Sequence, residues 1–190
     1  MPEAEYENFG RKLAFYTAPT LLGIKCASLI SLSCAEFDLE FHSEYFNSRA
    51  AGKMLKIKIL RSSESRKLLL VYNEKLLTKR LSECDVKGIL KKYGYNDGYS
   101  LDECLDYLSE RFGKGESFPH EIGLFLDYPV EDVVGFIRNK GENFQLCGAW
   151  KVYGSEENAR RAFANYDKCR KFLCNKLNEG IDIYQALRIS

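Results

Sequence analysis

The spacing of apolar residues predicts two neighbouring strands in the first half of the chain. Over Leu55–Leu60, apolar residues alternate with lysines, which is the period of two of a strand with one solvent-facing side. In Lys67–Tyr72, every residue after the lysine is apolar or aromatic, as in a strand that is covered on both faces. The polar segment 61–66 joins the two, so we expect an antiparallel hairpin. A third strand is predicted over Leu146–Tyr153.

Helical periodicity and end signals account for most of the remaining chain. A buried helix is predicted from Pro19 to about Leu32, with Thr17 as its N-cap and the proline in its first turn. The pairs Ser82/Asp85 and Ser100/Glu103 have the spacing of a capping box and predict two further helix starts. Outside residues 118–137, helices are predicted over residues 19–32, 37–50, 82–94, 100–113 and 155–178.

The segment Phe118–Ile137 predicts two short helices joined by a tight turn, with Gly123 at the crossing. This spacing also fits a DNA-binding helix-turn-helix. In that motif the first residues of the second helix meet base edges and phosphates. Here that helix begins with Val130, Glu131 and Asp132, and carboxylates stabilise a helix N-terminus without any ligand. We therefore favour a packed helical hairpin over a DNA reader.

These elements indicate an α+β fold, with a small, mostly antiparallel three-stranded sheet, several covering helices and a central helical hairpin. The chain has 190 residues, which suits one domain over residues 1–190. Its composition is 45% hydrophobic and 29% charged, as in ordinary globular proteins. The net charge of +1 provides no overall attraction for nucleic acid or an anionic membrane.

Cysteine usage and the start of the chain indicate a cytoplasmic protein. There are seven cysteines, an odd number with no C-x-x-C pair, and the first residues are acidic rather than those of a signal peptide. We expect reduced thiols. The apolar window Leu13–Leu32 is interrupted by Pro19 and Lys25, so we expect no membrane span. With only His42 and His120 available, we expect no metal site.

His120 and Glu121 are the first candidates for chemistry. Pro119 is expected to fix His120 in the first turn of a helix, where the macrodipole favours a neutral imidazole. Such a group could act as a base, donate to an oxyanion or bind a metal. Alternatively, His120 hydrogen-bonds a neighbouring loop and Glu121 complements the helix terminus. Because the two residues are adjacent, their side chains diverge and form no tight dyad.

A second set of candidates comes from the predicted third strand, where alternation places Cys147, Lys151 and Tyr153 on one face. If this face looks toward His120, a Cys-His nucleophile is conceivable. Alternatively, Cys147 is a core residue, and Lys151 and Tyr153 form the wet side of an edge strand. Trp150, on the opposite face, is expected to be a core anchor.

Lys25 is the last candidate, because it interrupts an apolar helical stripe. Its side chain either snorkels to the surface or meets a buried carboxylate or bound anion, and a desolvated lysine has a lowered pKa.

Several motifs are absent, namely G-x-G-x-x-G, the P-loop, G-x-S-x-G and H-E-x-x-H, where Leu124 stands in place of the second histidine. Their absence argues against the corresponding nucleotide, hydrolase and zincin chemistries, and no particular cofactor is indicated.

Three blocks of the sequence together resemble a known family. They are residues 18–25, 118–137 with its Pro-His-Glu-Ile-Gly run, and 147–153, with Tyr166 and Cys169 beyond. The family is a domain of unknown function, number thirty-seven ninety-three, found mainly in clostridia and related anaerobic Firmicutes. Its members more often have His-Cys where this chain has Tyr16-Thr17, and glycine at the position of Asp127. Membership implies a cytosolic bacterial protein and supplies no reaction.

Two classes of function follow from these observations. We favour a non-enzymatic cytosolic binding or regulatory protein, whose balanced charge suits a protein partner better than nucleic acid. The alternative is a small-molecule enzyme or redox accessory protein with a site around His120 and Cys147, extended by Glu121, Lys151 and Tyr153. Lys25 belongs to the same alternative if its amine is buried.

Overall fold

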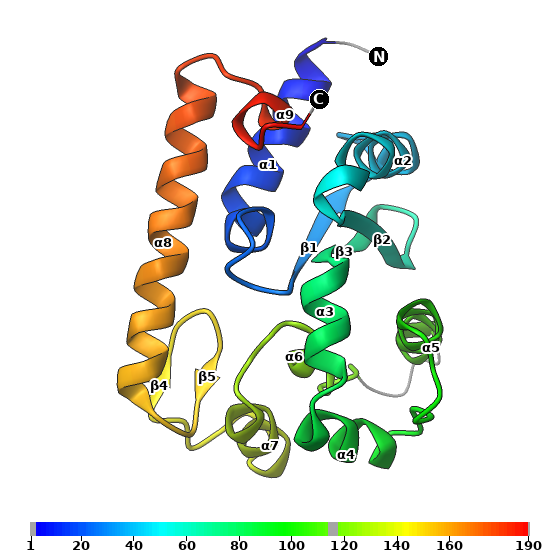
Figure 1. Ribbon diagram of the computed structural model, residues 1–190, viewed down its shortest axis with the longest axis vertical. Helices are drawn as coiled ribbons and strands as arrows, with labels where there is room; N and C mark the ends of the chain where they lie inside the picture. The colour runs from blue at the N-terminus through cyan, green and yellow to red at the C-terminus, as the bar shows by residue number, and fades with distance from the viewer. Residues whose placement is uncertain (1–2, 114–117, 190) are drawn as a thin grey trace.

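The main sheet has three antiparallel strands in the order β1-β3-β2 (Figure 1). The computed structural model describes residues 3–113 and 118–189. Strand β1 spans Ala27–Ser33, β2 spans Leu55–Ser62 and β3 spans Arg66–Asn73. The predicted β2–β3 hairpin is confirmed, with Ile57 opposite Val71. The α+β class is confirmed as well.

The third strand of this sheet is not the one that the sequence predicted. Residues 27–32, expected to lie in a helix, belong to β1, which pairs with β3 and has Leu29 opposite Leu70. Ile30 and Leu32 are buried whereas Ser31 between them is exposed, which is the alternation of a strand. The helix prediction was wrong here because a short apolar run fits both periods.

Strand β3 separates two hydrophobic cores. Leu69 and Val71 face the first core, which is formed with α1 (Glu3–Leu21), α2 (Leu39–Ala50), α9 (Ile183–Ala186) and the C-terminal part of α8 (Glu156–Asn178). Leu70 and Tyr72 face the second core, which is formed with the helices within residues 74–138, α3 to α7. Burial on both faces explains why β3 is apolar throughout, as predicted.

Helix α1 spans Glu3–Leu21, so Pro19 lies in its last turn rather than at the start of a new helix. Thr17 is an interior residue of α1, and its hydroxyl donates to the carbonyl oxygen of Leu13 (2.8 Å) instead of capping a helix. The chain then turns at Gly23, whose φ of 71° lies in the left-handed region. This turn starts the return of the chain toward β1.

Four helices follow in the middle of the chain, together with a single 3₁₀ turn, η1, over Ala51–Lys53. Their bounds are α2 Leu39–Ala50, α3 Glu74–Leu81, α4 Cys84–Lys92 and α5 Leu101–Gly113. The capping box predicted at Ser100 is present, since its Oγ accepts from the Glu103 N–H and Glu103 accepts from the Ser100 N–H. The one predicted at Ser82 is absent, because Ser82 ends α3 and Glu83 precedes α4. Helix α3 was not predicted.

The central helical hairpin is confirmed, with α6 over Ile122–Phe125 and α7 over Val130–Arg138. A Cβ atom on Gly123 would lie only 2.8 Å from Cγ2 of Val133, so the two helices approach at a position that requires glycine. Beyond α7, strands β4 (Leu146–Cys147) and β5 (Lys151–Val152) form a separate two-stranded antiparallel sheet.

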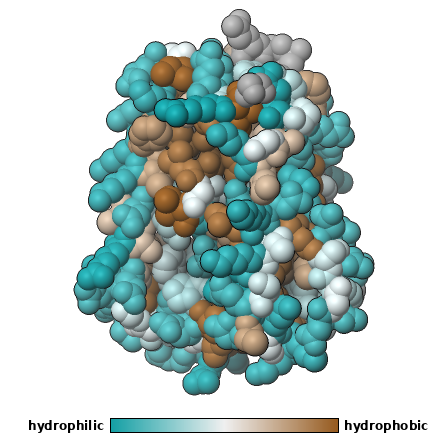
Figure 2. All heavy atoms as spheres, viewed as in Figure 1, coloured by the Kyte–Doolittle hydropathy of each residue, from teal (hydrophilic) through white to brown (hydrophobic). Residues whose placement is uncertain are grey.

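The chain ends in α8, over Glu156–Asn178, and α9, over Ile183–Ala186. The predicted start of the last long helix is confirmed, since Ser155 is the N-cap of α8, and α8 lies beside α1 (Figure 1). Figure 2, in the same view as Figure 1, shows that polar residues cover most of this face of the molecule. Hydrophobic residues gather in the upper half of the face, beside α1. Among the described helices, none combines the length and the apolar character that a membrane crossing requires.

Candidate functional site

A pocket of about 380 Å³ lies between the helical hairpin and the β4–β5 sheet. Its wall is mainly aliphatic and aromatic, and one residue, Leu29, comes from the main sheet. Three of the predicted candidates line it together, namely His120, Cys147 and Lys151. Small-molecule sites in proteins typically have volumes of about 300–1,000 Å³ and mostly apolar walls. The pocket is thus large enough for a small ligand.

The aromatic wall of the pocket is held by hydrogen bonds around Asp132. This buried carboxylate accepts from Nε1 of Trp150 through Oδ2 (2.6 Å), and through Oδ1 from the backbone N–H groups of Tyr153 (2.6 Å) and Gly154 (2.7 Å). Tyr128 stacks on Trp150 with ring centroids 5.0 Å apart. Its hydroxyl donates to the carbonyl oxygen of Ala149 (3.2 Å). The first turn of α7 is thereby fixed to the β4–β5 hairpin.

Lys151 and His120 lie near one ring, that of Phe136. Nζ of Lys151 is 6.0 Å from the centroid of this ring and 4.8 Å from that of Phe144, and it donates to the carbonyl oxygen of Gly141 (2.7 Å). The imidazole of His120 is exposed, with its centroid 5.0 Å from that of Phe136. Lys151 and His120 therefore add nitrogen-bearing side chains to a mainly apolar wall.

The predicted strand over Leu146–Tyr153 is wrong, because residues 148–150 form the turn of a hairpin. Cys147 and Lys151 nevertheless lie on one side, since they pair across β4 and β5. Cys147 is exposed, which excludes the core alternative. Tyr153 does not line the pocket. Its ring packs against Gly135, and its buried hydroxyl has no hydrogen-bond partner in the described part of the protein.

His120 and Glu121 lie in the turn before α6, a helix of only four residues. The dipole of so short a helix is small, so the predicted helix-terminus effect on His120 has little basis here. Glu121 is fully buried and forms an ion pair with Arg111, and Tyr95 donates to the same carboxylate oxygen (3.5 Å). Glu121 thus anchors α6 to α5, and the predicted divergence of the two side chains is confirmed.

Lys25 is buried, with 7% of its surface exposed, in the turn between α1 and β1. Its Nζ lies 4.9 Å from the ring centroid of Tyr128 and 5.5 Å from that of Tyr166. Burial lowers the pKa of Lys25 to about 8, and the neighbouring Cys26 and Asp127 partly offset that effect. Lys25 does not snorkel, and it is not among the residues that line the pocket.

Asp127 is the acidic neighbour of Lys25. Its Oδ1 is 3.7 Å from Nε of Arg80, and its Oδ2 accepts from the N–H of Cys26 (3.3 Å). Burial raises the pKa of Asp127. The hydrogen bond from Cys26 and the positive charges of Arg80 and Lys25 act in the opposite direction. Its φ of 63° lies in the left-handed region, which glycine adopts without strain. A glycine, which the family resemblance leads us to expect at this position in other members, would adopt this conformation without strain.

Sequence reasoning missed three residues that build the pocket. Asp132 was interpreted as a helix-terminus acid, Tyr128 as a residue of the turn between the two helices, and Phe136 as an inward-facing helix residue. Trp150 was expected to be a core anchor, and its burial confirms this (8% exposed). The closeness of Trp150 to Cys147 and Lys151 in the sequence was a usable signal, because ligand sites combine hydrophobic and aromatic side chains with a few polar groups.

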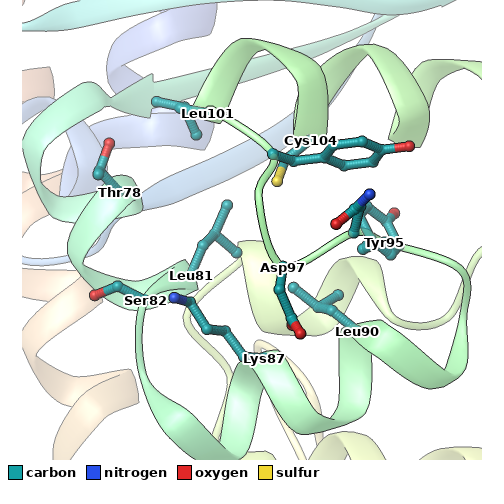
Figure 3. A pocket seen from close by; sticks show the side chains of 11 residues that line it. Thr78, Leu81, Ser82, Lys87, Leu90, Tyr95, Asp97, Leu101 and Cys104 are labelled. Carbon is teal, nitrogen blue, oxygen red and sulfur yellow. The ribbon is translucent and has the colours of Figure 1, made fainter.

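A second pocket, of about 130 Å³, lies between α3, α4 and α5 (Figure 3). Thr78, Ser82 and Lys87 lie on one side of it in this view, and Tyr95 and Leu90 on the other. Its volume is below the usual range for small-molecule sites. Among residues 3–113 and 118–189, no three side chains of His, Cys, Asp or Glu form a set that could hold a metal ion.

Fold and pocket together define an α+β protein with a preformed apolar pocket. The chain belongs to a family described as "Protein of unknown function (DUF3793)", whose model matches residues 13–187. This confirms the resemblance predicted from the three sequence blocks. Comparisons with curated proteins and with solved structures found no match.

Proposed function

We propose that this protein is a non-enzymatic binding protein whose pocket takes a small, mainly apolar molecule. The observation that carries the proposal is the pocket of about 380 Å³ between α6, α7 and the β4–β5 hairpin. Its aliphatic side includes Leu29, Ile122 and Leu126, and its aromatic side includes Phe136 and Trp150. Such a wall favours an apolar occupant, since burying apolar surface is the main source of its binding energy.

The fixed geometry of the wall supports this proposal. Three hydrogen bonds to Asp132 and the stacking of Tyr128 on Trp150 hold the aromatic side in place. A binding site that is rigid before its ligand arrives loses little conformational entropy on binding. The same arrangement supplies no hydrogen-bonded pair of catalytic groups in the described part of the pocket, which favours binding over catalysis.

Trp150 makes the proposal directly testable, because it is the only tryptophan of the chain and it lines the pocket. Titration with octanamide, a neutral hydrophobe that does not absorb near tryptophan, is expected to change the emission saturably. Cys147→Phe introduces a ring at the pocket and is expected to weaken binding about tenfold or more, equivalent to roughly 1.4 kcal/mol. Cys84→Phe is the matched control, since Cys84 is also exposed but does not line the pocket.

Native mass spectrometry of protein purified without oxygen supplies a second readout. We expect a molecule to copurify with the wild type and with Cys84→Phe but not with Cys147→Phe. Emission that does not respond to octanamide, together with a wild-type mass that equals that of the chain alone, would contradict the proposal.

A second candidate is nucleophilic chemistry, favoured by the presence of Cys147, His120 and Lys151 around one pocket. In such a step the sulfur of Cys147 adds to the carbon of a carbonyl group, the π electron pair of that group moves to its oxygen, and His120 accepts the thiol proton. Iodoacetamide labelling followed by peptide mass spectrometry compares Cys147 with the exposed Cys84 in the same sample. Faster labelling of Cys147, lost in His120→Ala, would favour this candidate. Equal rates would exclude it and leave the binding proposal standing.

A further inference from the structure

The two charged side chains that line the pocket, Asp132 and Lys151, differ in how much of their hydrogen-bonding capacity is used within the protein. Asp132 is the only carboxylate among the described lining residues, and it is 3% exposed. Both of its oxygens accept hydrogen bonds, from Trp150, Tyr153 and Gly154. A carboxylate occupied in this way contributes little attraction for a cationic ligand, because its hydrogen-bonding capacity is used within the protein.

Lys151, in contrast, has N–H donors that make no hydrogen bond within the described part of the protein. An ammonium group has three N–H donors, and the described contacts occupy one of them, at the carbonyl oxygen of Gly141 (2.7 Å). No carboxylate in the described part of the chain forms an ion pair with Lys151. Its Nζ instead lies near the rings of Phe144 and Phe136, which hold a cation but leave its charge uncompensated.

His120 adds a second donor near the same place. Its ring contacts Phe136, the ring that Lys151 also approaches, and no hydrogen bond to the described residues occupies either of its nitrogens. Lys151 and His120 both line the pocket. The pocket thus combines an apolar interior with unsatisfied positive charge and hydrogen-bond donors, and its one acid is already saturated.

We propose that the ligand of this pocket is an amphipathic monocarboxylate. This inference rests on the proposed binding function and adds the chemical class of the ligand. The apolar body packs among Leu29, Ile122, Leu126 and the ring of Trp150. The carboxylate accepts hydrogen bonds from the two remaining N–H donors of Lys151 and from His120. Such charge-assisted hydrogen bonds are about twice as strong as neutral ones, so they select an anion over a neutral ligand of the same shape.

Octanoate and octanamide test this class, because they share one apolar chain and differ in the charge of the head group. Titrations of wild-type protein, followed by Trp150 emission below the micellar range, are expected to give at least tenfold tighter binding of octanoate. Lys151→Met keeps the length of the side chain and removes its charge. It is expected to remove most of the preference for octanoate while leaving the affinity for octanamide within about twofold, since His120 remains as a donor.

Two further variants make the result specific. Lys151→Arg is expected to restore most of the preference for octanoate, because the guanidinium keeps the charge. Lys140→Met is the matched control, since Lys140 is exposed and does not line the pocket, and its preference should equal that of the wild type. Far-ultraviolet circular dichroism establishes that each variant is folded.

The outcomes separate this inference from the binding function on which it rests. If octanoate and octanamide bind wild-type protein equally well, the monocarboxylate class is wrong and the apolar binding function stands. The class is also wrong if Lys151→Met keeps the full preference for octanoate. If neither compound binds, both proposals fail.

Discussion

Arg170 on α8 donates a hydrogen bond through Nε to the carbonyl oxygen of Phe15 on α1, at 3.1 Å. In a continuous helix this oxygen would accept from the N–H of residue 19, but residue 19 is proline and has no N–H. The guanidinium of Arg170 also lies 5.2 Å from the centroid of the Phe15 ring. A side chain of the last long helix therefore replaces the backbone hydrogen bond that the proline removes from the first.

Arg170→Ala is expected to lower the free energy of unfolding by about 1 kcal/mol, which is typical of one hydrogen bond. The loss should be smaller in a Pro19→Ala background, since the alanine N–H can then donate to the Phe15 oxygen. Urea denaturation of the two single variants and the double variant measures this coupling. Asp167→Ala is the control, because it removes only the exposed ion pair between Arg170 and Asp167. Additive losses in the cycle would contradict the replacement.

Gly123→Ala is expected to lower the free energy of unfolding by about 1–3 kcal/mol, because its Cβ would lie 2.8 Å from Cγ2 of Val133. The double variant with Val133→Ala should recover part of this loss. Gly88→Ala, within α4, is the matched control. A Cβ at Gly88 meets no atom within 4 Å, so this substitution should stabilise the protein by about 0.5–1 kcal/mol. Thermal unfolding of the three variants and the wild type provides the comparison, and equal effects of the two glycine substitutions would contradict the tight crossing.

Local signals in the sequence were sufficient for much of the fold. The lysines that alternate within β2 indicated one wet face, and Ser100 with Glu103 indicated the start of α5, because both patterns arise from neighbouring residues. Strand β1 could not be found in the same way. Its apolar residues fit the spacing of a helix as well as that of a strand. It is a strand because it pairs with β3, about forty residues away in the sequence.

The pocket illustrates the same limit at the level of function. The alternation rule brought Cys147 and Lys151 to one side of a strand that does not exist, and they share a side because they pair across a hairpin. Leu29 reaches the same pocket from β1, which the sequence did not predict as a strand. Such a wall depends on contacts between distant segments, and a single sequence contains no local signal for them.

The pH dependence of stability should reveal the burial of Lys25. The pKa of Lys25 is lowered from 10.5 to about 8 in the folded protein. Between these two values the unfolded state binds more protons at this position than the folded state, so the contribution of Lys25 to the free energy of unfolding rises with pH. Below about pH 8 both states are protonated, and the buried charge destabilises the fold.

Lys25→Met removes this contribution, so the variant is expected to gain stability over the wild type near pH 7, and the gain should shrink toward pH 10. The pKa of Cys26 is raised to about 12, which acts in the opposite direction above pH 9, so the difference between variant and wild type is the informative quantity. Urea denaturation at several pH values measures it. A difference that does not change with pH would show that the amine of Lys25 is solvated.

Asp132→Asn is expected to lower the free energy of unfolding by about 2–3 kcal/mol. An amide presents two N–H donors and one acceptor where three donors now converge on a carboxylate, so at least one buried donor loses its partner. Because Trp150 is one of those donors, its emission maximum and near-ultraviolet circular dichroism should change as well. Glu131→Gln is the matched control, since Glu131 is the adjacent, exposed acid of the same helix turn. If Asp132→Asn binds octanamide as tightly as the wild type does, the hydrogen bonds of Asp132 do not hold the pocket wall. The rigidity argued for the site is then wrong.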